Sequence, residues 1–188
     1  MSVHKLHCQL IKTTTLDTTF SWNTAIKGSS PTHSLALFAS MIRGGAARPD
    51  GYTFPLVLKA CAAARLVRLG REVHGMAAKV GFLGSDVYVN NALVSFYGRS
   101  GLVEDAVKVF DEMRVRDVVS WSSMIGCFVE NGFGYDAVSL FRQMQVDGVD
   151  GVWKPDEVMM LSVIAGIASL GDLELGKWVR KYVMWMSR

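Results

Sequence analysis

The sequence predicts an all-α fold, a right-handed α-solenoid in which helix-turn-helix repeats stack on one another. Three observations predict it: two sequence recurrences, and apolar residues at helical spacing within each repeat. In the first recurrence, "DAVKVFDEM" at 105–113 matches "DAVSLFRQM" at 136–144. In the second, over a separation of several repeats, "RPDGYTF" at 48–54 matches "KPDEVMM" at 154–160. Self-similarity at a fixed period is typical of repeat architectures.

A recurring Asp gives natural boundaries between repeats. Division after each such Asp yields four complete repeats, at 19–50, 51–86, 87–117 and 118–156. Residues 1–18 are expected to form the second half of an earlier repeat, and residues 157–188 an incomplete fifth repeat. The chain is therefore expected to be an array cut at both ends. Four complete repeats exceed the roughly three that bury a continuous core.

The N-terminal segment allows two interpretations. Residues 1–16 include Lys5 and Lys12 and no acidic residue, which superficially resembles an organelle transit peptide. However, His7 precedes Lys12 at the same spacing at which His74 precedes Lys79. This internal similarity favours the interpretation as a partial repeat.

Each repeat is expected to contain two amphipathic helices. In the fourth repeat, apolar residues follow helical spacing twice, at Trp121, Met124, Ile125 and Phe128 and then at Ala137, Leu140, Phe141 and Met144. Gly132 and Gly134 lie between the two stripes, and Gly132 is expected to end the first helix. In the first repeat, "SSP" at 29–31 provides a helix cap followed by a proline at a helix start. One hairpin alone cannot cover both stripes, so the hairpins must stack.

Composition narrows the function classes without selecting one. Half of the residues are hydrophobic and the net charge is +3, which excludes a disordered tail and is compatible with nucleic acid without being evidence for it. The longest uncharged run extends from Val158 to Gly171 and is too short for a membrane helix. We therefore expect no membrane insertion.

No pattern for catalysis or cofactor binding stands out. The three cysteines are widely spaced, and neither C-x-x-C nor H-x-E occurs. His4, His7 and Cys8 lie close together, but no fourth metal ligand is near them. A Gly-rich phosphate loop is also absent from the sequence. The expectation is a protein that is not an enzyme and holds no metal or other cofactor.

Four segments resemble the pentatricopeptide repeat family. They are "TFSWNTAIKG" at 19–28, "YTFPLVLKACAAARLVRLGREVHGMAAKVGFLGSD" at 52–86, "DVYVNNALVSFYGRSGLVEDAVKVFDEM" at 86–113 and "DVVSWSSMIGCFVENGFGYDAVSLFRQMQVDG" at 117–148. The succession of repeat lengths, followed by another long-type start, resembles the P, L, S, P, L order of the plant PLS-type subclass. The first repeat is shorter than this pattern and the fourth carries an insertion. The deaminase-like domain that some relatives carry at the C-terminus has no counterpart in this sequence.

The resemblance implies binding of single-stranded organelle RNA, with one base per repeat. In the family, the fifth and last residues of a repeat together select a base, which implies base-reading pairs Asn23 with Asp50 for U, Asn91 with Asp117 for U, and Ser122 with Asp156 for G. The second repeat has Pro55 in the fifth position and its base is unassigned, so the implied preference is U-x-U-G. The second residue of each repeat would sandwich the base, which implies Phe20, Tyr52, Tyr88 and Val119.

Other interpretations remain open for these residues. Asp50, Asp117 and Asp156 precede helices, where Asp is a preferred N-cap. Arg99 is expected to contact phosphate, although its counterpart in the fourth repeat is Glu130, which would repel it. For the whole chain, the family resemblance implies RNA editing or processing in a mitochondrion or chloroplast, with catalysis supplied by a partner enzyme acting in trans. The alternatives are a protein–protein interaction scaffold and a truncated product without activity.

Overall fold

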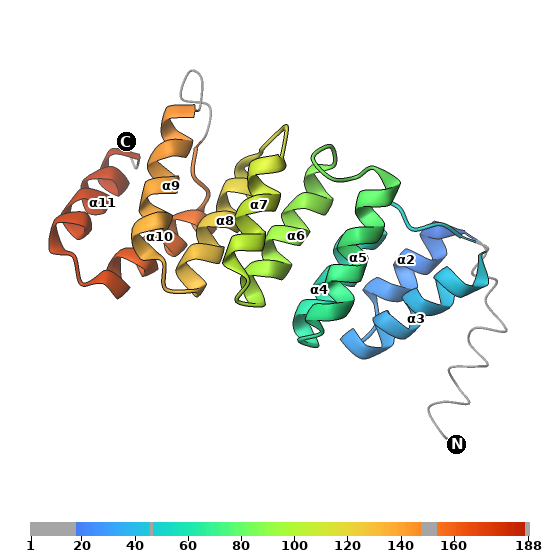
Figure 1. Cartoon of the computed structure of the whole chain (residues 1–188). Helices are drawn as coiled ribbons and strands as arrows, with labels where there is room; N and C mark the ends of the chain where they lie inside the picture. Colours follow the sequence, from blue (N-terminus) through green and yellow to red (C-terminus); the bar gives the residue numbers. More distant parts are fainter. Residues whose placement is uncertain (1–17, 46, 148–153, 187–188) are drawn as a thin grey trace. The chain divides into compact units, whose positions relative to one another are not determined.

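The computed structural model describes residues 18–45, 47–147 and 154–186, and every regular element within them is an α-helix (Figure 1). The helices of these ranges are α2 (Thr19–Lys27), α3 (Pro31–Gly44), α4 (Thr53–Ala63), α5 (Val67–Val80), α6 (Val87–Arg99), α7 (Val103–Glu112), α8 (Val118–Glu130), α9 (Gly134–Asp147), α10 (Glu157–Leu170) and α11 (Leu173–Met186). The predicted all-α class is confirmed. The helices form two compact units, up to Gly75 and from Met76 onward.

The N-terminal unit is built on the hairpin of α2 and α3, which packs against α4. Gly28 ends α2, and Ser30 and Pro31 occupy the N-cap and first helical position of α3. This start agrees with the prediction from "SSP", since proline fits the first turn without losing a hydrogen bond. The core of the unit contains the buried side chains of Trp22, Ile26, Phe38, Met41, Phe54 and Leu58.

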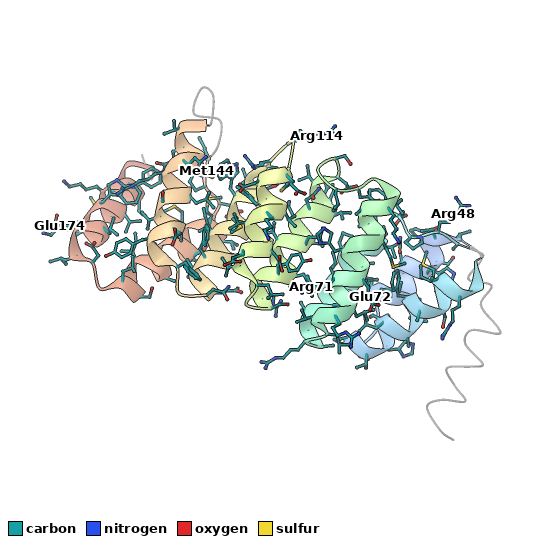
Figure 2. All side chains as sticks on the ribbon, in the orientation of Figure 1. Arg48, Arg71, Glu72, Arg114, Met144 and Glu174 are labelled. Carbon is teal, nitrogen blue, oxygen red and sulfur yellow. The ribbon has the colours of Figure 1, made fainter. Side chains whose placement is uncertain are left out.

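The C-terminal unit contains the hairpins α6–α7, α8–α9 and α10–α11 (Figure 1). The first helices of these hairpins pack side by side, α6 on α8 and α8 on α10. Aromatic contacts join successive repeats, because the rings of Phe110 and Trp121 meet edge to face with centroids 5.2 Å apart. Arg116 covers the Phe110 ring at 4.4 Å and donates a hydrogen bond to the Phe110 carbonyl. Side chains thus fill the space between neighbouring helices (Figure 2).

The predicted apolar stripes are largely buried, with two differences. Phe128 and Leu140 are only half-buried, whereas Trp121, Ile125 and Phe141 lie in the core. Gly132 has a φ of +83° just after α8, which glycine adopts without strain. It therefore ends the helix as predicted.

The position of Gly134 between the two apolar stripes predicts an interhelix glycine, and this prediction is wrong, because Gly134 is the first residue of α9. A Cβ atom added at Gly134 would lie 2.9 Å from the Gly166 carbonyl oxygen and 2.9 Å from Leu170 Cγ. The glycine therefore permits a close approach of α9 and α10. Its role is packing between helices, which the local sequence could not show.

Two predicted features lie outside the described residues. They are the N-terminal partial repeat with His4, His7 and Cys8, and most of the expected surface loop at 147–152. Within the described ranges, no three His, Cys, Asp or Glu side chains gather where a metal ion would fit. The described helices also include none with the length and apolar character that crossing a membrane requires.

Candidate nucleic-acid interface

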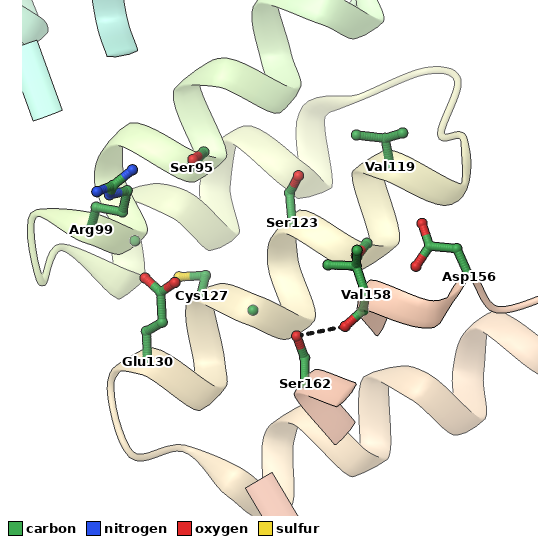
Figure 3. A pocket seen from close by; sticks show the side chains of 12 residues that line it. Ser95, Arg99, Val119, Ser123, Cys127, Glu130, Asp156, Val158 and Ser162 are labelled. Carbon is green, nitrogen blue, oxygen red and sulfur yellow. Dashed lines mark hydrogen bonds between the residues drawn. The ribbon is translucent and has the colours of Figure 1, made fainter. Parts of the chain in front are cut away.

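The first helix of each hairpin in the C-terminal unit contributes to the lining of a groove of about 380 Å³ (Figure 3). Residues from three helices line it: Ser95, Gly98 and Arg99 from α6, Val119, Ser122, Ser123, Gly126, Cys127 and Glu130 from α8, and Val158 and Ser162 from α10, with Asp156 just before α10. Small hydroxyl groups and glycines dominate this lining. Such a surface offers hydrogen-bond donors and acceptors without closing the groove.

Large apolar side chains are exposed at one recurring position. The second residues of the four complete repeats, Phe20, Tyr52, Tyr88 and Val119, have exposed fractions of 80%, 75%, 74% and 53%. Singly exposed apolar side chains are common, and what distinguishes these four is that they recur at one position of each repeat. Each compact unit contains two members of the series.

A fifth member of the series, Val158, was not predicted. This side chain is 65% exposed and lines the groove from α10 (Figure 3). The signal was present in the sequence, since Val158 corresponds to Tyr52 in the recurrence that pairs 48–54 with 154–160. Val158 therefore extends the series of exposed apolar positions into the fifth repeat.

The predicted base-reading pair of repeat 1 is joined by hydrogen bonds. The Asn23 side-chain Nδ2 donates to Asp50 Oδ1 at 3.0 Å. The Thr53 hydroxyl lies 2.7 Å from Asn23 Oδ1 and donates to it. Asp50 Oδ1 also accepts the backbone N–H groups of Tyr52 and Thr53, at 3.0 and 2.9 Å. The pair is thus part of a connected network at the start of α4.

The pair of repeat 3 is joined less completely. Asn91 Nδ2 donates to Asp117 Oδ1 at 3.2 Å, and Ser120 donates to the same oxygen through its backbone N–H at 2.7 Å and its hydroxyl at 2.8 Å. Asn91 is only 8% exposed. Its Oδ1 is buried and accepts no hydrogen bond within the described part of the chain. Asn91 is therefore largely shielded from solvent, although its predicted base-reading role requires an amide that a base can reach.

The pair of repeat 4 lines the groove without a direct bond. Ser122 and Asp156 are both groove residues, and Asp156 Oδ1 accepts the Met159 backbone N–H at 2.7 Å. No hydrogen bond joins Ser122 to Asp156 among the described residues. The groove brings them to one surface from two helices.

Helix capping is confirmed for Asp117 and Asp156, and Asp86 has the same role. Asp86 is the N-cap of α6, Asp117 of α8 and Asp156 of α10. Asp117 also forms a capping box with Ser120. For α4, Tyr52 occupies the N-cap position. Asp50 lies two residues earlier and still accepts the Thr53 N–H. Capping uses Oδ1 of each carboxylate, so the same side chain can act as a cap and present its second oxygen.

Two of these carboxylates are stabilised in their charged form. Burial raises the pKa of Asp50, but hydrogen bonds from Asn23 and Thr53 outweigh it and leave the pKa below its ordinary value. Burial likewise raises the pKa of Asp117, and hydrogen bonds from Ser120 and Asn91 outweigh it. Both groups are therefore ionised at neutral pH.

The groove carries mixed charge and no activated nucleophile in its described lining. Arg99 and Glu130 face it from α6 and α8 (Figure 3). Arg99 is exposed, as a phosphate contact requires, and Glu130 is exposed on the same surface. Burial, with a contribution from the Glu130 charge, raises the pKa of the Cys127 thiol to about 11. The thiol is thus protonated at neutral pH.

Comparison with known families identifies the repeats. The family model described as "PPR repeat" matches residues 91–118 and 119–149. The chain is a pentatricopeptide repeat protein. It is 42% identical over 170 residues to the Arabidopsis thaliana pentatricopeptide repeat-containing protein At1g59720, chloroplastic/mitochondrial, in a match that covers 88% of this chain and 26% of the relative. The Arabidopsis thaliana protein At4g21065 is 37% identical, over 88% of this chain and 28% of its own length.

The fold of this pentatricopeptide repeat protein matches solved structures. The crystal structure of the pentatricopeptide repeat protein PPR10 from maize gives a TM-score of 0.70 at 21% identity, over 98% of this chain and 27% of that one. PPR10 in complex with an 18-nucleotide psaJ RNA element gives 0.70 at 20% identity, over 92% and 27%. The predicted solenoid fold is thereby confirmed. The chain spans about a quarter of the length of the curated relatives it matches.

Proposed function

We propose that this chain binds single-stranded RNA and selects bases through the pairs Asn23–Asp50, Asn91–Asp117 and Ser122–Asp156. The observation that carries the proposal is the exposed apolar residue next to each pair. Phe20, Tyr88 and Val119 stand three residues before Asn23, Asn91 and Ser122, one helical turn away. An aromatic or aliphatic side chain beside hydrogen-bonding groups suits an unstacked base, since the face of the base packs on the apolar side chain and its edge stays available for hydrogen bonds.

The preferred sequence follows from the pairs as U-x-U-G. Two repeats present an amide with a carboxylate and one presents a hydroxyl with a carboxylate. Tyr52 supplies the stacking face of the second repeat, while Pro55 has no side-chain donor and leaves its base unselected. Arg99 contacts phosphate, and Glu130 opposes it, so the electrostatic contribution to affinity is modest.

The cellular role is RNA editing or processing in a plant organelle. Support comes from the names of relatives, which include "chloroplastic/mitochondrial" and "mitochondrial", and from the PLS-like succession of repeat lengths. A partner enzyme acting in trans supplies the chemistry. The complex of PPR10 with an RNA element supports RNA as the ligand of this fold.

Binding at fixed salt tests this function. The assay measures fluorescence anisotropy of labelled RNAs containing U-A-U-G, a scrambled sequence, and U-A-U-G paired in a duplex. Tyr88→Ala should weaken binding of the single strand by about 1–3 kcal/mol, the scale of one base–aromatic stack. Tyr135→Ala is the matched control, since Tyr135 is 62% exposed but lies on α9, outside the series of exposed second residues of the repeats. Equal affinity for all three RNAs, or equal effects of the two substitutions, would favour a protein-interaction scaffold instead.

A further inference from the structure

A hydroxyl side chain accompanies each asparagine of the base-reading pairs. It belongs to the third residue of the following repeat, which is Thr53 for Asn23 and Ser120 for Asn91. Where the fifth residue is not Asn, the third residue of the next repeat has no hydroxyl. After repeat 2, with Pro55, this third residue is Val89, and after repeat 4, with Ser122, it is Met159. The hydroxyl is thus present in both cases where an amide must be oriented.

Thr53 is fully buried and its hydroxyl makes specific bonds. Its oxygen accepts the Asp50 backbone N–H at 3.0 Å, so its single proton remains to be donated. Two acceptors are in reach, Asn23 Oδ1 at 2.7 Å and Asp50 Oδ1 at 2.9 Å. Asp50 Oδ1 already accepts three N–H groups. The proton therefore goes to Asn23 Oδ1.

These two partners fix the orientation of the Asn23 amide. Nδ2 faces the Asp50 carboxylate and Oδ1 faces the Thr53 hydroxyl. A rotation of the amide by half a turn would lose the bond to Asp50 and place the amide oxygen against the carboxylate, where neither oxygen can donate. The Thr53 hydroxyl would also have to give up its bond to Asn23 Oδ1, so the network opposes this rotation.

Amide orientation is what separates U from C. Uracil has an N–H at ring nitrogen N3 and a carbonyl at C4, whereas cytosine has an acceptor at N3 and an amino group at C4. An asparagine amide fits one pattern in one orientation and the other pattern when rotated, because its donor and acceptor exchange places. A locked amide discriminates between the two bases, and a rotating amide accepts both.

We infer that Thr53 is a positioning residue that holds the Asn23 amide in the orientation that favours U over C. The inference rests on the proposed function, since it concerns how an RNA base is selected at the Asn23–Asp50 pair. Repeat 3 is the internal comparison. Ser120 donates to Asp117 Oδ1 at 2.8 Å, and the buried Asn91 Oδ1 accepts no bond from the described residues. Repeat 1 therefore distinguishes U from C more strictly than repeat 3.

The test measures the affinity ratio of the full chain for U-A-U-G and C-A-U-G, and for U-A-U-G and U-A-C-G, at one salt concentration. The wild type should prefer U over C at the first position by about tenfold, the scale of one or two hydrogen bonds. Thr53→Val removes the hydroxyl at nearly constant size, and the ratio should fall below about twofold at the first position. Thr53→Ser restores a hydroxyl and should restore most of the preference. The ratio at the third position is the control and should not change.

The outcomes separate the two proposals. Equal binding of U and C by the wild type at the first position would contradict base selection by the Asn23–Asp50 pair, and the inference with it. A wild-type preference that persists in folded Thr53→Val would overturn the role of Thr53 alone. Loss of preference at both positions would also overturn it, because a general loss of structure would then explain the result. Circular dichroism of each variant establishes that it is folded.

Discussion

Repeats 1 and 3 carry the same two residues at corresponding positions, but these residues are held differently. Asn23 is bonded at both ends of its amide, by Asp50 and by Thr53. Asn91 is bonded only at Nδ2, by Asp117, and its buried oxygen has no partner in the described structure. The same residue pair, Asn with Asp, thus contains a rigid amide in repeat 1 and a less constrained amide in repeat 3.

A pair of residues therefore does not by itself define a hydrogen-bonding site. In each pair, the carboxylate oxygen that bonds the asparagine also accepts the backbone N–H of the helix cap. The hydroxyl of the third residue of the next repeat donates its one proton either to this oxygen or to the asparagine. A buried acceptor without a donor costs about 1–3 kcal/mol. Among the described residues, Asn91 Oδ1 of repeat 3 has no donor, whereas Asn23 Oδ1 of repeat 1 accepts from Thr53.

Removal of the carboxylate of repeat 3 should have the largest effect. Asp117→Ala removes the cap of α8 and leaves Asn91 Nδ2 without its acceptor. Loss of an N-cap costs about 0.5–2 kcal/mol and loss of a buried partner adds to it, so we expect about 2 kcal/mol of destabilisation. Urea unfolding followed by circular dichroism measures this change.

Asp156→Ala is the matched control for that experiment. Asp156 also caps a helix of the C-terminal unit, but it accepts only the Met159 N–H among the described residues and holds no asparagine. We expect about 1 kcal/mol of destabilisation. Equal losses in the two variants would mean that the bond between Asn91 and Asp117 contributes nothing to stability.

A change of the fifth residue in repeat 4 should alter base preference. Ser122→Asn gives repeat 4 the amide and carboxylate of repeats 1 and 3, so its preferred base should change from G toward U by about 1 kcal/mol. Met159 follows in place of Thr53, and its side chain cannot orient the new amide. Discrimination between U and C should consequently stay weaker than in repeat 1.

Binding of U-A-U-G, U-A-U-U and U-A-U-C at one salt concentration measures this change. Ser139→Asn is the matched control, because Ser139 is exposed on α9 and does not line the groove. If wild type and Ser122→Asn show the same order of preference, Ser122 does not contact the base.

The sequence predicted most of the fold because its information was periodic. The two recurrences and the apolar stripes were enough to place the helices, since a stripe must be buried wherever it occurs. Close contacts were not predictable in this way. The role of Gly134 depends on Gly166 and Leu170, which approach it from another repeat.

The candidate site could be predicted in part. The aspartates were found because they recur at the end of each repeat, whereas the exposed series followed from the second position that the family resemblance implies. Val158 could have been found from the recurrence of 48–54 at 154–160. The hydrogen bonds of Asn23 and Asn91 could not be predicted, because they depend on the direction of hydroxyl groups in the following repeat. Such directions are set by the fine geometry of helix packing, which residue types do not encode.

A conservative change should bring repeat 3 closer to repeat 1. Ser120→Thr places at the start of α8 the residue that orients Asn23 at the start of α4. If its hydroxyl then donates to Asn91 Oδ1, the protein gains one buried hydrogen bond and a stability of about 0.5–1 kcal/mol. The midpoint of urea unfolding measures the gain. The change to Val at the same position should give no gain, and a gain from both would point to apolar packing instead.

Acid should produce the smallest effect, and it should affect both repeats. The pKa values of Asp50 and Asp117 lie below the ordinary value of 3.8 in the folded chain. A carboxyl whose pKa is lowered by folding stabilises the protein above its unfolded pKa, and this stabilisation is lost as the pH falls through the folded pKa. The loss should therefore begin near the ordinary pKa and continue below it. Burial opposes the shift in both groups, so the slope should be shallow.

Unfolding free energies measured from mildly acidic pH down to a pH well below the ordinary carboxyl pKa test this expectation. Asn23→Ala removes a donor to Asp50 and should flatten the dependence, because the pKa of the carboxyl then returns toward its ordinary value. Asn91→Ala should do the same for Asp117, and by a smaller amount, since Ser120 supplies that carboxyl with its two stronger donors at 2.7 and 2.8 Å. A steeper dependence in either variant would contradict the assignment of these hydrogen bonds to the charged carboxylates. Equal flattening in both would instead remove the distinction between repeats 1 and 3 as far as the aspartates are concerned.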